Sequence, residues 1–145
     1  MTHLCKQAQP LIRFRTNDII QLTAVDIAAC GRSTPRFKVI GRSDDMVVVR
    51  GINVFPTMVS EIINKICNLS GEYRITLNSP PPYHRLLLDV ELDKHHGELV
   101  ASDDLIRKVE ENIKTPIGVQ SDVILLPPDS LPRTEGKSRR IIKRY

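Results

Sequence analysis

The stretch Phe55-Pro-Thr-Met-Val-Ser-Glu-Ile-Ile-Asn-Lys-Ile66 decides the fold class, because its apolar residues recur at intervals of three and four. This spacing predicts a helix with one buried face. Pro56 suits the start of that helix, since the fixed φ of proline matches the first helical turn. The predicted buried residues are Met58, Val59, Ile62, Ile63 and Ile66.

Downstream of this helix the apolar pattern predicts, in order, a strand at 73–77, a strand at 86–92, a second helix from Ser102 and a last strand at 123–126. The second helix carries two aspartates near its positive end and is ended by Pro116 and Gly118. Its predicted buried residues are Leu105, Ile106, Val109 and Ile113. The order predicts an α+β fold in which a small antiparallel-rich sheet packs with two helices.

Upstream of Pro56 two strand signals are present. Alternation of Ile12, Phe14 and Thr16 with arginines predicts a first strand, and a β-hairpin is predicted from 37–41 and 46–50 around an acidic turn. A strand so early in the chain has no visible partner. We therefore expect residues 1–40 to be the remnant of a larger domain and 41–145 to form a small domain; a short N-terminal strand in a complete protein is the alternative.

Charge is unevenly distributed along the 145 residues. The net charge is +4, but from Arg133 onward there are six Lys or Arg and one Glu, so this tail carries +5 and the rest of the chain about −1. A basic tail could attract nucleic acid, an acidic membrane face or the phosphates of a small ligand. Aromatic residues make up only 4% of the chain, which weighs against a general nucleic-acid platform.

Other classes of protein are disfavoured by composition. No apolar run approaches the roughly 20 residues that span a bilayer, so a cytoplasmic protein without a membrane partner is expected. Cys5, Cys30 and Cys67 are widely spaced and lack a CxxC pair, so neither a disulfide framework nor a metal site is expected.

The segment Leu131-Pro-Arg-Thr-Glu-Gly-Lys137-Ser-Arg-Arg140 sets a lysine in a turn before the basic tail. Gly136-Lys137-Ser138 ends like a phosphate-binding loop, but Leu131 stands where that loop needs its first glycine. A mobile ammonium in such a turn could enter a site built elsewhere. Lys137 is therefore the candidate catalytic residue.

Four ordered segments carry a family resemblance: Leu11-Ile-Arg-Phe-Arg-Thr-Asn-Asp18, Ile40-Gly-Arg-Ser-Asp-Asp-Met46, Arg50-Gly-Ile-Asn-Val-Phe-Pro56 and Leu131-Pro-Arg-Thr-Glu-Gly-Lys137. Together they resemble the adenylate-forming acyl-CoA synthetase superfamily, most closely its phenylacetate-CoA ligase branch.

The resemblance implies a role for each matched residue. Asp18 would accept hydrogen bonds from the ATP ribose, Arg42 would lie on the nucleotide side, and Asp44 would be the hinge. Gly51 would lie beside the pantetheine tunnel of CoA, and Lys137 would be the adenylation lysine. In the first motif Asn17 stands where the family has glycine.

The implied activity is that of an AMP-forming aryl or acyl-CoA ligase, with ATP, CoA and a carboxylate as substrates. The chain would be the C-terminal lid domain preceded by the end of the large N-terminal adenylation domain, its partner. Mg²⁺ is expected in the complete enzyme but not on this chain, and the isolated chain is expected to be inactive. A homodimer is possible.

An alternative from another class is a free-standing module that binds an anion or nucleic acid through the basic tail. Steeply salt-dependent binding that is lost on removal of residues 133–145 would identify it.

Overall fold

The computed structural model describes residues 2, 5, 7–94, 103–133 and 140–145. The chain forms two compact units, Met1–Asp44 and Asp45–Tyr145, which are considered separately. The first unit ends at Asp44, four residues after the boundary predicted at residue 40. Among the described helices, none has the length and apolar character needed to span a bilayer.

The first unit is a two-stranded antiparallel hairpin of β1 (Asp18–Ala24) and β2 (Arg36–Arg42). The strand predicted around Ile12 and Phe14 is wrong: this stretch is not a strand and both side chains are exposed. Arg13 and Asn17 have φ of 50° and 63°, in the left-handed region, so the backbone cannot run as a regular strand through either position.

The hairpin predicted between 37–41 and 46–50 is also wrong in its pairing. Strand β2 pairs with β1, whereas β3 (Val47–Val49) pairs with β4 (Ile52–Val54) in the second unit. The reason is the turn between β3 and β4, where Arg50 and Gly51 have φ of 49° and 84°. Two consecutive positive φ values form the tight turn that matches the twist of a hairpin.

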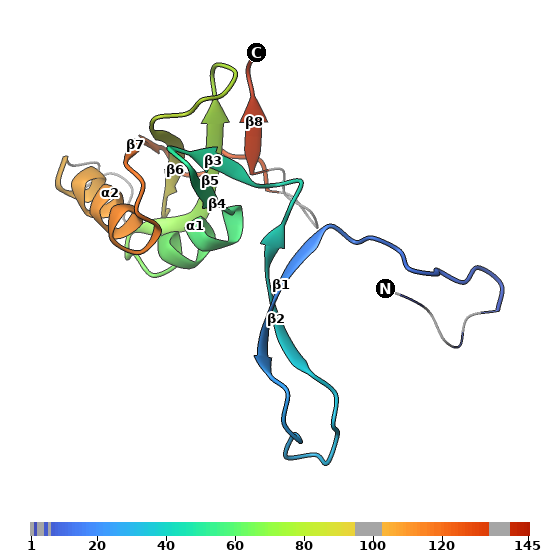
Figure 1. The fold of residues 1–145 in the computed structure, drawn as a ribbon. Coiled ribbons are helices and arrows are strands. Elements are labelled where there is room, and N and C mark those ends of the chain that lie inside the picture. Colours follow the sequence, from blue (N-terminus) through green and yellow to red (C-terminus); the bar gives the residue numbers. More distant parts are fainter. Residues whose placement is uncertain (1, 3–4, 6, 95–102, 134–139) are drawn as a thin grey trace. The chain divides into compact units, whose positions relative to one another are not determined.

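The second unit is built on a four-stranded sheet in the order β7-β6-β5-β8 (Figure 1). Its strands are β5 (Leu69–Leu77), β6 (Leu86–Leu92), β7 (Ser121–Leu126) and β8 (Ile141–Lys143). The central pair β5–β6 is antiparallel, but β6–β7 and β5–β8 are parallel. The sheet is therefore mixed, because the chain crosses over through a helix between β6 and β7 and returns as β8.

Helices α1 (Pro56–Ile63) and α2 (Asp103–Ile117) pack against the sheet and against each other. The predicted apolar stripes are confirmed in a single core, into which both helices and the sheet contribute side chains. Fully buried members include Val59, Ile63, Ile75, Val90, Val109 and Ile113. The α+β class with two helices is thus as predicted, and Ser102, the predicted start of the second helix, lies outside the described residues.

Strand β6 alternates between apolar and acidic side chains. Leu88 and Val90 belong to the core, so Asp89 and Glu91 point to the opposite face of the sheet. Asp89 accepts hydrogen bonds there from Arg74, at 2.9 and 2.7 Å, and from Thr76 at 3.1 Å. This face is polar yet partly buried, and Arg133 and Arg140 pair with carboxylates on it.

Candidate functional site

Three of the predicted site residues meet at the end of the β1–β2 hairpin. Asp18 and Arg42 are paired in register, with Arg42 Nη1 3.8 Å from Asp18 Oδ1. Arg42 also donates to both carboxylate oxygens of Asp44, from Nε at 2.9 Å and from Nη2 at 2.7 Å. One guanidinium therefore lies between the predicted ribose-binding acid and the predicted hinge.

The turn before β1 accommodates asparagine at position 17, where the resembled family has glycine. This residue has a φ of 63°, a conformation that asparagine tolerates better than most residues other than glycine. Its carbonyl accepts a hydrogen bond from the Ser43 amide at 2.8 Å, and the Asp18 amide donates to Thr16 Oγ1 at 3.4 Å. Asparagine thus supports the left-handed backbone that glycine would adopt, and the loss of glycine does not prevent the turn.

The ion pairs of this cluster remain accessible to water. The side chains of Asp18 and Arg42 are each 34% exposed and that of Asp44 is 47% exposed. Pairs of this kind contribute about 0 to 1 kcal/mol, since solvent screens them and ordering the side chains costs entropy. A ligand or a movement of the chain can therefore replace them at small cost.

Gly51 lies in the second unit, in the turn that joins β3 to β4. Within the part of the chain that the structure describes, no atom lies within 4 Å of a Cβ built on Gly51, so the turn is open on that side. The neighbouring Arg50 amide donates to the Tyr83 carbonyl at 3.0 Å, and Val49 forms a bridge with Tyr83. The contacts with Tyr83 thus hold one side of the turn, whereas the side on which a Cβ of residue 51 would lie is open.

Lys137 lies outside the described residues, within the segment 134–139. Both residues that border this segment are described, and both are arginines held by carboxylates. Arg133 pairs with the fully buried Glu91, and Arg140 pairs with Glu72. Although desolvation alone would lower the pKa of Arg133, the Glu91 carboxylate raises it above its ordinary value.

Sequence reasoning missed these carboxylates. Glu91 was recognisable only as a member of a strand, and its partners are 40 and 42 residues away in sequence. The only local signal was the alternation within β6, which put an acid on the face opposite the core. Asp129 extends the cluster: its pKa is lowered by the hydrogen bond from Lys94, and Arg133 lies 3.5 Å from it.

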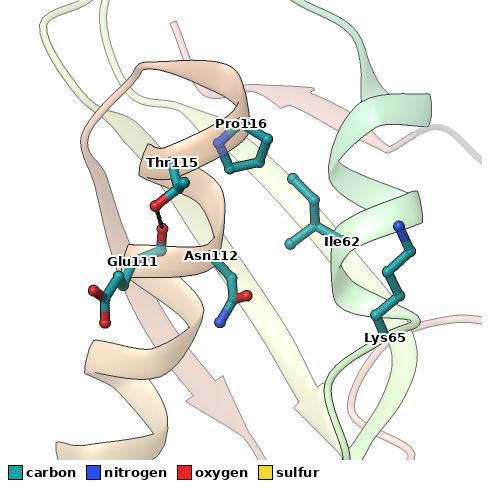
Figure 2. Close-up of a pocket in the computed structure, with 6 residues that line it drawn as sticks. All are labelled: Ile62, Lys65, Glu111, Asn112, Thr115 and Pro116. Carbon is teal, nitrogen blue, oxygen red and sulfur yellow. Dashed lines mark hydrogen bonds between the residues drawn. The ribbon is translucent and has the colours of Figure 1, made fainter.

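A groove of about 480 Å³ lies elsewhere, between α1 and α2, and contains none of the predicted site residues (Figure 2). It is lined by Ile62, Lys65, Glu111, Asn112, Thr115 and Pro116. Thr115 Oγ1 donates to the Glu111 carbonyl at 2.9 Å and Asn112 Nδ2 to the Lys108 carbonyl at 2.7 Å. Because these polar groups are bonded to their own helix, they do not converge on a ligand position.

No cluster of three or more potential metal ligands occurs among residues 7–94, 103–133 and 140–145. The three cysteines are exposed and free.

Comparison with known proteins places this geometry in a family. The family of the AMP-binding enzyme C-terminal domain matches residues 51–144. The phenylacetate-coenzyme A ligase of Thermus thermophilus is 34% identical over 97% of this chain and 35% of its own length. That of Escherichia coli is also 34% identical, over 97% of this chain and 32% of its own length. The chain thus spans about a third of these relatives.

Solved structures give the same result. A 2-hydroxyisobutyryl-CoA ligase in its postadenylation state matches with a TM-score of 0.86 at 34% identity, over 98% of this chain and 31% of that one. The same ligase in its thioesterification state matches with a TM-score of 0.61, over 98% and 30%. The chain belongs to the family of AMP-binding enzyme C-terminal domains.

Proposed function

We propose that this chain is the C-terminal part of an AMP-forming CoA ligase similar to phenylacetate-CoA ligase, in which Lys137 promotes adenylation of a carboxylate and Asp44 is the hinge. The observation that carries the proposal is the cluster of Asp18, Arg42 and Asp44. In it, the acid and the cation proposed to bind the nucleotide contact each other, and the cation also pairs with Asp44, the last residue of the first compact unit.

The cluster fits the requirements of a hinge. Rotation at Asp44 has to break or carry along its contacts with Arg42, and these exposed ion pairs cost little to lose. The two solved states of the 2-hydroxyisobutyryl-CoA ligase match this chain to different extents at almost equal identity. The corresponding region of that ligase therefore differs in shape between the two states, which supports a hinge here as well.

In the proposed reaction a carboxylate attacks the α-phosphorus of ATP, and two anions must approach each other. The Lys137 ammonium would bridge them as the transition state forms, since it carries three donors on a flexible stem. Asp18 would bind the ribose hydroxyls, and Gly51 would leave room for the pantetheine arm of CoA during thioester formation. Mg²⁺ and the acyl pocket would belong to the N-terminal adenylation domain.

An N-terminal partner is supported by the apolar face of the β1–β2 hairpin. Leu22 lies opposite Phe37, and Ile20 lies opposite Val39, so the four side chains share a face. They are between 49% and 61% exposed. A patch of this kind typically marks a contact with further protein. Cytoplasmic location and homodimer formation stay predictions.

The alternative function, binding of nucleic acid through the basic tail, is weakened by ion pairs within the chain. Binding of nucleic acid through the tail needs cations that are available to phosphates. Arg133 and Arg140, two of the six cations of the tail, are instead paired with Glu91 and Glu72.

The test is Lys137→Ala in the complete ligase that contains this chain. The formation of acyl adenylate should fall about a hundredfold to a thousandfold, the usual cost of removing one preorganised donor. Thioester formation from supplied acyl adenylate should be nearly unchanged. Lys143→Ala, an exposed cation of the same tail, is the control and should leave both steps intact. Equal loss of both half-reactions in Lys137→Ala would contradict the assigned role.

A further inference from the structure

We propose that Tyr83 is a positioning residue for thioester formation, because it holds the strained turn of Arg50 and Gly51 between β3 and β4. The inference rests on the proposed function, in which Gly51 leaves room for the pantetheine arm of CoA. Tyr83 belongs to none of the four segments that carry the family resemblance. It acts on the turn from a distant part of the chain.

The turn is strained at its first position. Arg50 has a φ of 49° and Gly51 a φ of 84°, both in the left-handed region. Glycine adopts such an angle readily, but in arginine the Cβ is crowded by the neighbouring backbone. A strained residue of this kind persists only where the surrounding structure holds it in place. The turn therefore depends on support from outside itself.

The backbone of Tyr83 provides this support. Its carbonyl accepts a hydrogen bond from the Arg50 amide at 3.0 Å, and Tyr83 forms a parallel bridge with Val49. Val49 is fully buried, so this end of β3 is itself well fixed. Tyr83 thus contacts the last residue of β3 and the first residue of the turn, the two residues that precede Gly51.

The side chain of Tyr83 is fixed in turn. It packs against the hydrophobic core, and its hydroxyl lies 3.2 Å from the hydroxyl of Tyr145, within hydrogen-bonding distance. Next to Tyr145, the Arg144 amide donates to the Leu77 carbonyl at 2.9 Å and so attaches this part of the chain to β5. The four-stranded sheet is therefore connected to the turn through Tyr145 and Tyr83.

A fixed turn favours the step that uses CoA. The pantetheine arm is long and flexible, and a binding surface that is already ordered does not have to lose further entropy when the arm binds. A turn that moves at Gly51 would have to be ordered in each binding event. Since adenylation does not use CoA, loss of the support from Tyr83 should raise KM for CoA and leave adenylate formation unchanged.

The first experiment measures amide hydrogen exchange by NMR in the 145-residue chain. Tyr83→Ala should increase the exchange rate of the Arg50 amide about tenfold, because exchange reports local opening. The Asp93 amide, which donates to the Asn68 carbonyl beyond the other end of β6, is the internal control. It should change less than about twofold. An unchanged exchange rate of the Arg50 amide would overturn the proposal.

A second variant tests the support without disturbing the core. Because Tyr145 is 54% exposed, Tyr145→Ala should fold normally and still increase the exchange of the Arg50 amide about threefold. Lys143→Ala, a change two residues earlier in the chain, is the matched control and should alter this rate less than about twofold. Equal rates in these two variants would contradict the support that Tyr145 gives to Tyr83.

The role of strain is tested by Arg50→Asn, because asparagine tolerates the left-handed conformation and suits the first position of this turn. In this background Tyr83→Ala should raise the exchange of the amide at position 50 less than about threefold, compared with about tenfold when arginine is present. An equal increase in both backgrounds would contradict the link between Tyr83 and the strained turn.

The second experiment uses the complete ligase and compares the two half-reactions. Tyr83→Ala should raise KM for CoA about fivefold and leave kcat for adenylate formation within about twofold. Tyr83→Phe, which keeps the ring, should raise KM for CoA less than about twofold. A general defect in folding would lower both half-reactions, so equal losses in Tyr83→Ala would overturn the positioning role.

The two proposals fail in different ways. If Gly51→Ala leaves thioester formation unchanged, the proposed function is wrong at Gly51 and the positioning role fails with it. If Gly51→Ala slows thioester formation while Tyr83→Ala leaves KM for CoA unchanged, the proposed function stands and the positioning role is wrong.

Discussion

The guanidinium of Arg42 donates two hydrogen bonds to the carboxylate of Asp44, two residues further along the chain. This pair closes the first compact unit at the residue after which the second begins. Because both side chains are partly exposed, the pair holds the end of β2 in place without making it costly to release.

Asp44→Pro should separate the backbone role of this position from its charge. Proline fixes φ and restricts the residue before it, so rotation at the hinge becomes difficult. In the complete ligase we expect thioester formation to fall about tenfold to a hundredfold, with adenylation reduced much less. The measurement is the rate of each half-reaction.

Asp44→Ala is the control, because it removes the carboxylate but leaves the backbone free. It should cost at most about 1 kcal/mol of stability and affect both half-reactions by less than threefold. If alanine is as damaging to thioester formation as proline, Asp44 acts through its charge and not as a hinge.

Gly51→Ala should weaken thioester formation more than it weakens folding. The φ of 84° costs an L-residue about 1 to 2 kcal/mol, but no atom is close enough to clash with the added methyl group. Gly31→Ala is the matched control, because Gly31 has a φ of 80° and no described atom lies within 4 Å of a Cβ added there. Thermal unfolding should show losses of similar size, while only the change at Gly51 should slow the attack of CoA. Similar rates of thioester formation in the two variants would argue against a pantetheine tunnel at Gly51.

Gly71→Ala should be more destabilising than either of these changes. A Cβ there would lie 2.5 Å from Oδ1 of Asn64, in addition to the strain of a φ of 86°. Because Asn64 is exposed and its side chain can turn away, the clash adds only a little to the strain of φ, and we expect a loss of about 1 to 3 kcal/mol in urea unfolding. Adding Asn64→Ala should recover the part due to the clash and leave the part due to φ. No recovery in the double variant would mean that the backbone alone accounts for the loss.

Burial raises the pKa of Tyr73 to about 12, although the nearby Arg140 lowers it. The unfolded chain releases this proton near pH 10, whereas the folded chain retains it up to about pH 12. Stability should therefore be complete below pH 10 and should fall by roughly 2 to 3 kcal/mol as pH rises from 10 to 12.

Tyr73→Phe tests this dependence. The variant should lose about 1 kcal/mol at pH 8, because the hydroxyl no longer donates to the Pro56 carbonyl, but it should show a flatter decline above pH 10. Denaturant unfolding at pH 8, 10 and 11.5 measures both effects. An unchanged slope above pH 10 in Tyr73→Phe would contradict the assignment.

Sequence reasoning succeeded where a local pattern is sufficient. Spacings of three and four located both helices and their buried residues, and the apolar run of β6 gave its bounds as observed. It failed for strand pairing, which depends on backbone angles at single residues. Nothing in the identity of Arg50 shows that it adopts a φ of 49° and so closes a hairpin with Gly51.

For the candidate site, sequence analysis was limited because interacting residues are far apart along the chain. The motifs pointed to Asp18, Arg42 and Asp44, and the structure brings these residues together. Whether they have the assigned roles stays a prediction. Glu72 and Glu91 carry no motif, and only the fold shows that Arg133 and Arg140 lie beside them, across more than 40 residues of chain.

Strand β8 was not predicted because it has three residues in a basic tail, yet it has a protective consequence. It covers the edge of β5 by parallel pairing at Ile75–Leu77, and an uncovered edge readily pairs with another molecule. Strand β8 is itself only three residues long, and Lys143 within it and Arg144 after it discourage further pairing. We therefore expect a variant truncated after Arg140 to aggregate more readily than the 145-residue chain, which light scattering would measure.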